Sequence, residues 1–374
     1  MYSSKANYLK HLYSRIPVKT MVLSQHMEGL TPPSVFVGRE GYPKVNIGPM
    51  MTTIGDNVSI MDKPEQWSGK AAEDILSFRI QMVRGKYAVK VKDFNTFVQN
   101  MQEIALAKHT VNLEAQFTKI PTGHYVDEEV HPYGPSAPIQ DVKTGNIKLE
   151  HHMEKAYYDT DLLSKDAVIA LYKKGLLFSS IQKAFSTGAF GLEKNRKLVP
   201  TRWSITAVDD MLGKHLISEI KNYHVIDSFQ VYEYEAMHNR FVVLFMPTVW
   251  QYEFLEAFIK VFGNEQMLYA DWEGHNGRKT YAGMGGCYYS ARLAAAEKLR
   301  SIKKQAGVLV FRESYRGYVP LGVWLIREHV RAAMKAQPKI FSDYQSAMNY
   351  VRTKIDLPYH RYVSSSKMLK NRQI

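Results

Sequence analysis

The sequence is poor in cysteine, because Cys287 is the only one among 374 residues. A single thiol excludes an internal disulfide framework and any zinc site built from several cysteines. No stretch approaches the roughly 18 to 20 uninterrupted apolar residues of a membrane span. Residues 1–19 lack the continuous apolar segment of a secretory signal, since Lys10, Arg15 and Lys19 interrupt them. These absences predict a cytoplasmic protein without a membrane partner.

Phosphate-binding loops are also missing. The glycines of residues 283–286 (GMGG) lack the spacing of the dinucleotide-binding fingerprint, and no Walker-type loop occurs. The chain has no internal repeat, no low-complexity tract and no long Gly/Ser linker. At 45% hydrophobic and 23% charged residues, it has the composition of a globular protein with room for two domains.

Acidic residues are scarce in one part of the chain. Residues 290–374 hold 17 Lys and Arg against 5 Asp and Glu, whereas residues 1–289 hold 32 against 31. Nearly all of the net charge of +13 therefore lies in the last 85 residues. This segregation favours a polyanionic partner such as DNA, because each cation placed on a phosphate releases condensed counterions. A solvated basic surface without a partner is the alternative interpretation.

Hydrophobic spacing predicts an α+β protein. The helix expected after Pro200 carries a possible capping box at Thr206 and Asp209, followed by an apolar stripe. Two β-rich runs around His238-Asn239 predict a hairpin over residues 228–247. Further helices are expected over residues 70–85, 94–108, 164–186, 288–304 and 343–352, further strands over residues 266–272 and 308–313, and a strand passing into a helix over residues 321–336.

The order of these elements predicts how the chain is divided. We expect a helical N-terminal half packed on a mixed, mostly antiparallel sheet with interleaved helices. The N-terminal domain would be helix-rich with a Gly/Pro-rich entry segment and span residues 1–190. The C-terminal domain would be α+β and basic, spanning residues 191–374.

Several segments resemble the archaeal Nre family of DNA-repair proteins, and the likeness runs over most of the chain. The matching segments are SVFVGREGYPKVNIGPM (34–50), NRKLVPTRWSITAVDDML (195–212), DWEGHNGRKTYAGMGGCYYSARLAAAEKL (271–299) and PLGVWLIREHVRAA (320–333). The resemblance implies a role in DNA-damage repair, with recruitment to the sliding clamp PCNA through a C-terminal peptide.

This chain departs from the family at both ends. Family members often carry a cysteine-containing segment ahead of SVFVGR, and the corresponding residues here contain no cysteine. The family's clamp-binding peptide starts with Gln and ends in two aromatic residues. In this chain only Arg372-Gln373-Ile374 stands where such a peptide would begin, so the clamp contact is expected to be incomplete.

Asp271 and Glu273, followed by Arg278, form the first candidate site. Side chains at i and i+2 of a strand share a face, so both carboxylates could enter one pocket. Two convergent carboxylates can begin a Mg²⁺ or Mn²⁺ site for phosphodiester cleavage, with an arginine on the phosphate. The alternative is a structural network in which both acids pair with nearby arginines and order the glycine-rich loop.

Arg202-Trp203 forms a second candidate, because Pro200 and Thr201 predict a turn that leads into a helix. An exposed helix N-terminus beside an arginine and an aromatic ring suits a phosphate and a base. The alternative interpretation places Trp203 in the hydrophobic core. Arg39, between Gly38 and Gly41, forms another candidate, since glycines allow close approach of a ligand; an ordinary tight turn is equally compatible.

A run of arginines interleaved with aromatic residues forms the remaining candidate for nucleic-acid contact. Arginine binds phosphate with two hydrogen bonds, and aromatic rings stack on unpaired bases. About half of these arginines are expected in internal ion pairs, because buried arginines are almost always paired. The candidates are Tyr288, Arg292, Arg312, Arg316, Arg327 and Arg331.

Two functions from different classes follow from these patterns. The first is a DNA-binding repair factor that contacts DNA through its basic, aromatic-interleaved C-terminal region. The second is a metal-dependent nuclease, or another phosphodiester enzyme, that uses Asp271 and Glu273. The sequence leaves open which of the two applies.

Overall fold

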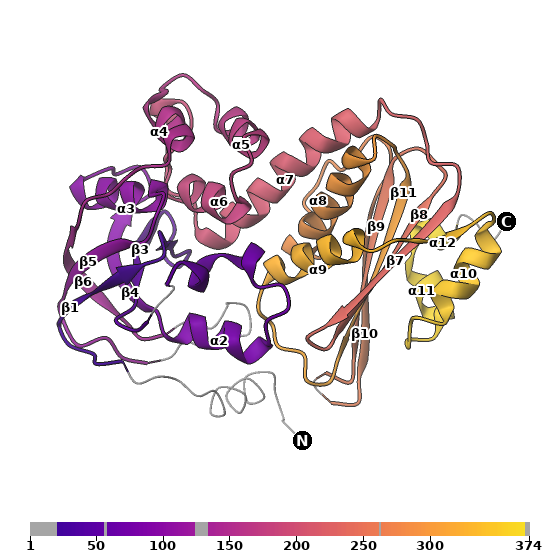
Figure 1. Ribbon diagram of the computed structural model, residues 1–374, viewed down its shortest axis with the longest axis horizontal. Coiled ribbons are helices and arrows are strands. Elements are labelled where there is room, and N and C mark those ends of the chain that lie inside the picture. The colour runs from indigo at the N-terminus through magenta and orange to yellow at the C-terminus, as the bar shows by residue number, and fades with distance from the viewer. Residues whose placement is uncertain (1–20, 56–57, 124–133, 262, 371–374) are drawn as a thin grey trace. The chain divides into compact units, whose positions relative to one another are not determined.

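The computed structural model describes residues 21–55, 58–123, 134–261 and 263–370. They form two compact units, residues 21–211 and 212–370, and the division falls within helix α7 (Thr201–Ile220). Each unit contains one six-stranded sheet with helices packed on it (Figure 1). The predicted α+β class is confirmed. Across the described residues, no helix is long and apolar enough to cross a membrane.

Residues 21–211 contain a sheet in the order β1-β5-β6-β4-β3-β2, in which only β4 and β6 are parallel. Its core lies between one face of the sheet and α3 (Thr96–Leu106), which buries Val98, Met101 and Ile104. The strands are β1 (His26–Thr31), β2 (Val35–Val37), β3 (Lys44–Met51), β4 (Val83–Lys90), β5 (Val111–Phe117) and β6 (Ser136–Thr144). The other helices are η1 (Val58–Asp62), η2 (Pro64–Gln66), α2 (Ala72–Ile80), α4 (His151–Tyr158), α5 (Ser164–Lys173), α6 (Phe178–Ser186) and η3 (Glu193–Asn195).

Residues 212–370 contain a sheet in the order β10-β9-β11-β8-β7-β12, in which only β11 and β9 are parallel. The helices α8 and α9 cover one face, and the helices α10 to α12 cover the other (Figure 1). The strands are β7 (Phe229–Ala236), β8 (Asn239–Met246), β9 (Gln251–Ile259), β10 (Gln266–Glu273), β11 (Gly307–Tyr315) and β12 (Lys339–Phe341). The helices are α8 (Gly286–Ser301), α9 (Val323–Lys335), α10 (Tyr344–Arg352), α11 (Tyr359–Ser365) and α12 (Lys367–Lys370).

The predicted hairpin is confirmed as β7 and β8, with Met237 and His238 in the two-residue turn. Their φ angles of 51° and 56° are those that a two-residue hairpin turn requires. The capping box at Thr206 is wrong, because Ser204 N already donates to Pro200 O at 2.9 Å and the helix begins at Thr201. The Gly/Pro-rich segment of residues 28–50 predicts the strands and turns that β1 to β3 form, whereas β4, β5 and β6 are not predicted from the sequence.

Candidate nucleic-acid interface

Two exposed aromatic rings from distant parts of the sequence lie against each other in the unit of residues 21–211. The ring centroids of Tyr42 and Trp203 are 5.1 Å apart, and their planes are tilted by 56°. Tyr42 is 43% exposed and Trp203 is 44% exposed. We call these two residues the aromatic pair. Exposure excludes the interpretation of Trp203 as a core residue.

The turn between β2 and β3 positions Tyr42. Lys44 N donates to Gly41 O at 2.9 Å, which closes the turn. Gly41 has a φ of 77°, and a Cβ atom at this position would lie 2.8 Å from Lys44 O. The turn therefore requires glycine at residue 41, which explains one of the two glycines that flank Arg39 and Glu40.

The start of α7 positions Trp203. Thr201 Oγ1 accepts a hydrogen bond from Val37 N at 2.9 Å, which ties the helix start to β2. Ser204 Oγ donates to Thr201 O at 2.8 Å, and Gln182 Nε2 donates to Ser204 Oγ at 2.6 Å. These contacts hold the first turn of α7 beside the β2–β3 turn, and so they bring the aromatic pair together.

Two of the candidate arginines accompany the aromatic pair. Arg202 is exposed and precedes Trp203, while Arg39 is half-buried and lies in the same turn as Tyr42. The structure therefore brings together two candidates that the sequence analysis treats separately.

A basic sheet face begins next to Tyr42. Lys44 on β3 is directly opposite Lys90 on β4, and both side chains are exposed. Lys86 has the same parity on β4 as Lys90, so it lies on the same face. Together with exposed Lys119, these residues form what we call the basic face. Like charges directly opposite each other on a sheet are destabilising, so this arrangement favours an anion that lies over it.

The pKa of Lys86 reflects its burial and the charges around it in the basic face. Burial lowers the pKa of Lys86, and the positive charges of Arg84 and Lys119 lower it further, whereas Glu40 opposes them. The guanidinium of Arg84 lies 3.7 Å above the ring centroid of Phe36 and is buried beneath this face. A phosphate over the face would offset this repulsion.

The basic face was not predicted from the sequence, whereas Tyr42 belongs to the turn motif around the candidate Arg39. The signal for the face is the period-two spacing of Arg84, Lys86 and Lys90, which places all three side chains on one side of a strand. The predicted helix over residues 70–85 is too long, because α2 ends at Ile80 and β4 starts at Val83. The period-two spacing of these basic residues indicates a shared face only if the segment is recognised as a strand.

The C-terminal arginine candidates divide into buried and exposed groups. Arg292, Arg312 and Arg327 are each at most 2% exposed, so their guanidiniums are not offered to a nucleic acid in the folded unit. Arg312 pairs with Glu256 and also donates to Asn239 Oδ1. Tyr288 is also buried.

Two further arginine candidates lie nearer the surface. Arg331 donates to both carboxylate oxygens of Glu297 at 2.6 and 2.7 Å, and to Glu328 at 2.8 Å. Its charge is therefore balanced within the unit. Arg316 is exposed, in the segment between β11 and α9. Of the C-terminal candidates, Arg316 is the one whose position suits direct contact with DNA.

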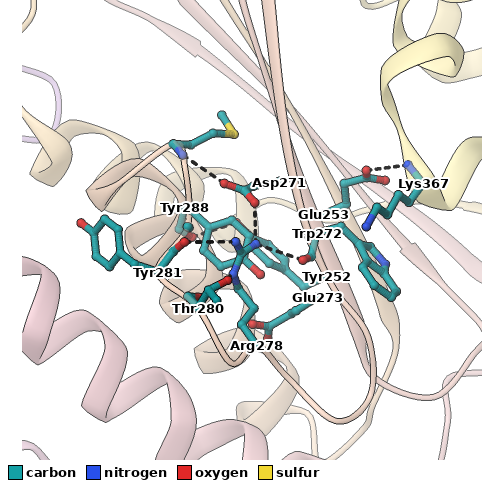
Figure 2. A network of polar contacts seen from close by, with 12 residues as sticks. Tyr252, Glu253, Asp271, Trp272, Glu273, Arg278, Thr280, Tyr281, Tyr288 and Lys367 are labelled. Carbon is teal, nitrogen blue, oxygen red and sulfur yellow. Dashed lines mark hydrogen bonds and ion pairs between the residues drawn. The ribbon is translucent and has the colours of Figure 1, made fainter.

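Asp271 and Arg278 form an ion pair that orders the glycine-rich loop (Figure 2). Arg278 Nη1 donates to Asp271 Oδ1 at 2.5 Å, and Asp271 Oδ2 accepts from Met284 N at 3.0 Å. The Arg278 guanidinium also donates to three backbone carbonyls, those of Trp272, Thr280 and Tyr281. Both oxygens of this carboxylate therefore accept hydrogen bonds within the protein.

Glu273 forms a second, deeper ion pair. Its Oε2 accepts from Arg292 Nη1 at 2.8 Å, and its Oε1 accepts from Trp250 Nε1 at 3.3 Å. The side chains of Glu273 and Arg292 are 1% and 2% exposed. Burial raises the pKa of neighbouring Tyr288, and the negative charge of Glu273 raises it further. Both oxygens of the buried Glu273 carboxylate therefore already accept hydrogen bonds within the protein.

The carboxylates of Asp271 and Glu273 are therefore poorly suited to bind a metal ion. Within the ranges that the structure describes, no group of three or more His, Cys, Asp or Glu residues is arranged to hold a metal ion. Asp271 and Glu273 would each have to give up an arginine before binding Mg²⁺ or Mn²⁺. Because a buried charge without its partner costs several kcal/mol, such an exchange is unfavourable.

Models of protein families match most of the chain. The description "Archaeal Nre, N-terminal" applies to residues 3–262, and "Archaeal Nre, C-terminal" applies to residues 273–374. No solved structure matches the chain.

Three curated proteins are similar to this chain along most of their length. DNA repair protein NreB of Archaeoglobus fulgidus is 40% identical over 349 residues, which cover 91% of this chain and 88% of that protein. DNA repair protein NreA of the same organism is 37% identical over 336 residues, 87% of this chain and 84% of that protein. DNA repair protein NreA of Haloferax volcanii is 31% identical over 340 residues, 84% of this chain and 80% of that protein.

Proposed function

The chain belongs to the archaeal Nre family, and from this premise we propose that it acts in DNA repair by binding DNA directly. The proposed contact surface consists of the basic face and the aromatic pair, with Arg39 and Arg202 beside the rings. The observation that carries the proposal is the gathering of cations around two exposed aromatic rings, in a unit whose sequence has almost no charge surplus. Phosphates would bind the cations and bases would contact the rings.

The exposed cations of residues 290–370 contribute a second, less specific attraction in this proposal. They raise the local concentration of DNA without reading its structure, because long-range charge acts on every phosphate backbone alike. A role on DNA also agrees with the cytoplasmic location that the sequence predicts. The exposed residues are Arg300, Lys303, Arg316, Lys335, Lys339, Arg352, Lys367 and Lys370.

Binding of labelled DNA to the full chain tests this proposal. Single-stranded, duplex and forked oligonucleotides are titrated at several salt concentrations, with wild type and with a Lys44→Ala, Lys86→Ala, Lys90→Ala variant. Each lost phosphate contact should reduce the slope of log affinity against log salt by about 0.9. The matched control replaces three exposed lysines elsewhere in the same unit, namely Lys148, Lys165 and Lys174. Equal affinities and slopes for both variants, or no binding by wild type, would contradict the proposal.

The sliding clamp PCNA is the protein partner that the family resemblance implies, and residues 371–374 lie outside the described residues. Just before them, Met368 and Leu369 are buried, and Met368 N donates to Glu253 Oε2 at 2.9 Å. Met368 and Leu369 are therefore engaged in the fold and are not offered to a partner. We expect a peptide from Ser364 to Ile374 to bind the clamp more weakly than micromolar. A micromolar or tighter dissociation constant by calorimetry would show that Gln373 belongs to a clamp-binding motif.

A further inference from the structure

We propose that the aromatic pair takes an unpaired base, so that the protein prefers single-stranded or locally opened DNA over intact duplex. The inference rests on the proposed function and deepens it, because it names the form of DNA that the surface selects. In a duplex both faces of each base are covered by its neighbours. A base can stack on a protein ring only where its own stack is interrupted.

The geometry of the aromatic pair leaves ring surface available. A tilt of 56° at a centroid distance of 5.1 Å means that the two rings touch without covering each other face to face. More than two fifths of the surface of each residue is exposed. Two adjoining, exposed aromatic rings leave apolar surface in water, and a stacked base would remove that surface from water.

The pair is also held in place before any ligand arrives. Tyr42 belongs to a closed turn that needs Gly41, and Trp203 belongs to the first turn of a helix tied to β2 through Thr201. Rings that are already ordered lose little conformational entropy on binding, so more of the stacking free energy becomes affinity. This distinguishes the pair from flexible surface aromatics.

Cationic side chains next to the aromatic pair can bind the phosphates of a DNA single strand. Lys44 follows Tyr42 by two residues, Lys90 lies opposite Lys44, and Lys86 continues along the same face. Arg202 precedes Trp203 in the exposed first turn of α7. A single strand with one base on the rings can therefore place its neighbouring phosphates on these cations. The cations alone would bind any form of DNA, and the rings supply the discrimination.

Three oligonucleotides of one sequence test the inference with the full chain: a single strand, its duplex, and the duplex with one unpaired base. A 2-aminopurine replaces the unpaired base, and an identical base is placed in the single strand. Stacking on a protein ring should change the fluorescence of the 2-aminopurine when the DNA binds. The variants are Trp203→Ala, Trp203→Phe and Tyr42→Ala, and Tyr158→Ala is the matched control. Tyr158 is 68% exposed and lies against Tyr157 on α4, so its removal also deletes an exposed ring that contacts a second ring.

We expect wild type to bind the single strand and the unpaired-base duplex more tightly than the plain duplex. Trp203→Ala should lower the affinity for the first two by about 5- to 100-fold and abolish the fluorescence change, because stacking is worth about 1–3 kcal/mol per base. Its affinity for plain duplex should stay within about twofold. Trp203→Phe should keep part of the effect, and Tyr158→Ala should behave as wild type. Unchanged melting temperatures show that the variants are folded.

Three results would overturn the inference. If wild type binds all three DNA forms equally, or if Trp203→Ala weakens all three by one factor, the pair takes no unpaired base, while the proposed DNA binding stands. If wild type binds none of the three, the proposed function fails and the inference fails with it.

Discussion

His329 on α9 is a buried histidine that the fold keeps neutral. Its ring lies edge-on to Tyr234 and Phe241, with centroids 5.2 and 5.6 Å away. No described residue forms a hydrogen bond with its Nδ1. Burial lowers the pKa of His329 to about 3, and the positive charge of Arg312 contributes to the shift. Protonation therefore requires the surrounding structure to open.

The low pKa of His329 predicts that the folded protein loses stability at acidic pH. Because the folded pKa is depressed below the unfolded value of about 6.5, the stabilisation is complete above pH 6.5 and is lost as the pH falls toward 3. We expect His329→Phe, which keeps a ring in place, to lose about 3 kcal/mol less stability than wild type between pH 6.5 and pH 4. Chemical denaturation at each pH measures this, with exposed His360→Phe as the control. Parallel pH profiles for wild type and His329→Phe would contradict it.

The carboxylates of Asp271 and Glu273 differ in how deeply they are buried, and this predicts an order of stabilities. Asp271→Asn weakens a pair whose side chains are each 15% exposed, whereas Glu273→Gln leaves Arg292 charged in the interior. Breaking a buried pair costs about 3–5 kcal/mol. We expect the larger loss for Glu273→Gln and the smaller loss for Asp271→Asn. Thermal unfolding of both variants measures this.

The same variants test the nuclease alternative. Incubation of wild type with labelled DNA in Mg²⁺, Mn²⁺ or EDTA should leave the DNA intact, because both carboxylates are engaged by arginines. Metal-dependent cleavage that Asp271→Asn abolishes without a change in melting temperature would instead support catalysis. That outcome would require Asp271 to exchange Arg278 for a metal ion.

At the scale of elements, one buried carboxylate attaches the C-terminal helices to the sheet. Glu313 on β11 accepts hydrogen bonds from Asp356 N at 2.9 Å and Leu357 N at 2.8 Å, in the connection between α10 and α11. It also accepts from the hydroxyls of Tyr315 and Tyr362, at 2.6 and 2.9 Å. Four donors therefore depend on a single side chain that is 1% exposed.

Glu313→Ala should loosen this part of the chain more than the rest. An unsatisfied buried donor costs about 1–3 kcal/mol, and here two of the donors are backbone groups of the connection itself. We expect a loss of at least about 3 kcal/mol and faster tryptic cleavage near Arg352 and Lys354, because proteolysis follows local opening. Limited proteolysis locates the cut, and exposed Glu265→Ala serves as the control. Cleavage at the wild-type rate would show that contacts other than those of Glu313 hold these helices on the sheet.

Arginines also protect the outer edge of the second sheet. β10 is a terminal strand among the described residues. Lys260 N donates to Glu265 O, so the odd-numbered residues of β10 direct their backbone groups toward β9. The backbone groups of the even-numbered residues therefore point away from β9. Arg361 Nη2 donates to Gln266 O and Arg278 Nη1 donates to Trp272 O, both at 3.0 Å. Covering edge carbonyls with charged side chains discourages pairing with another strand. This gives Arg278 a structural role that its sequence position does not reveal.

At the scale of the whole molecule, the cations of the C-terminal region should act on every form of DNA alike. Replacing exposed Arg316, Lys335 and Lys339 with Ala should lower the affinities for single-stranded and duplex DNA by the same factor and reduce the salt slope. The basic-face variant and this one should therefore differ little on duplex DNA. Anisotropy titrations at several salt concentrations make the comparison. A loss confined to one DNA form would mean that this region recognises DNA structure.

The sequence alone determined the features that depend on neighbouring residues. The β7–β8 hairpin was predictable because two β-rich runs flank a two-residue turn. The α+β class, the basic surplus after residue 289 and the family motifs are likewise properties of contiguous sequence. Strands β4, β5 and β6 were missed, and β4 pairs with β6 across a long segment that shows no local pairing signal.

Tertiary structure alone decided which charges reach the surface. Arg292 and Arg202 look alike in sequence, each within three residues of an aromatic residue, yet Arg292 is buried on Glu273 and Arg202 is exposed. Whether an arginine is buried depends on a carboxylate that meets it from another element, because an unpaired guanidinium is too costly to desolvate. The aromatic pair arises in the same way, since only the packing of β2 against the start of α7 brings Tyr42 to Trp203.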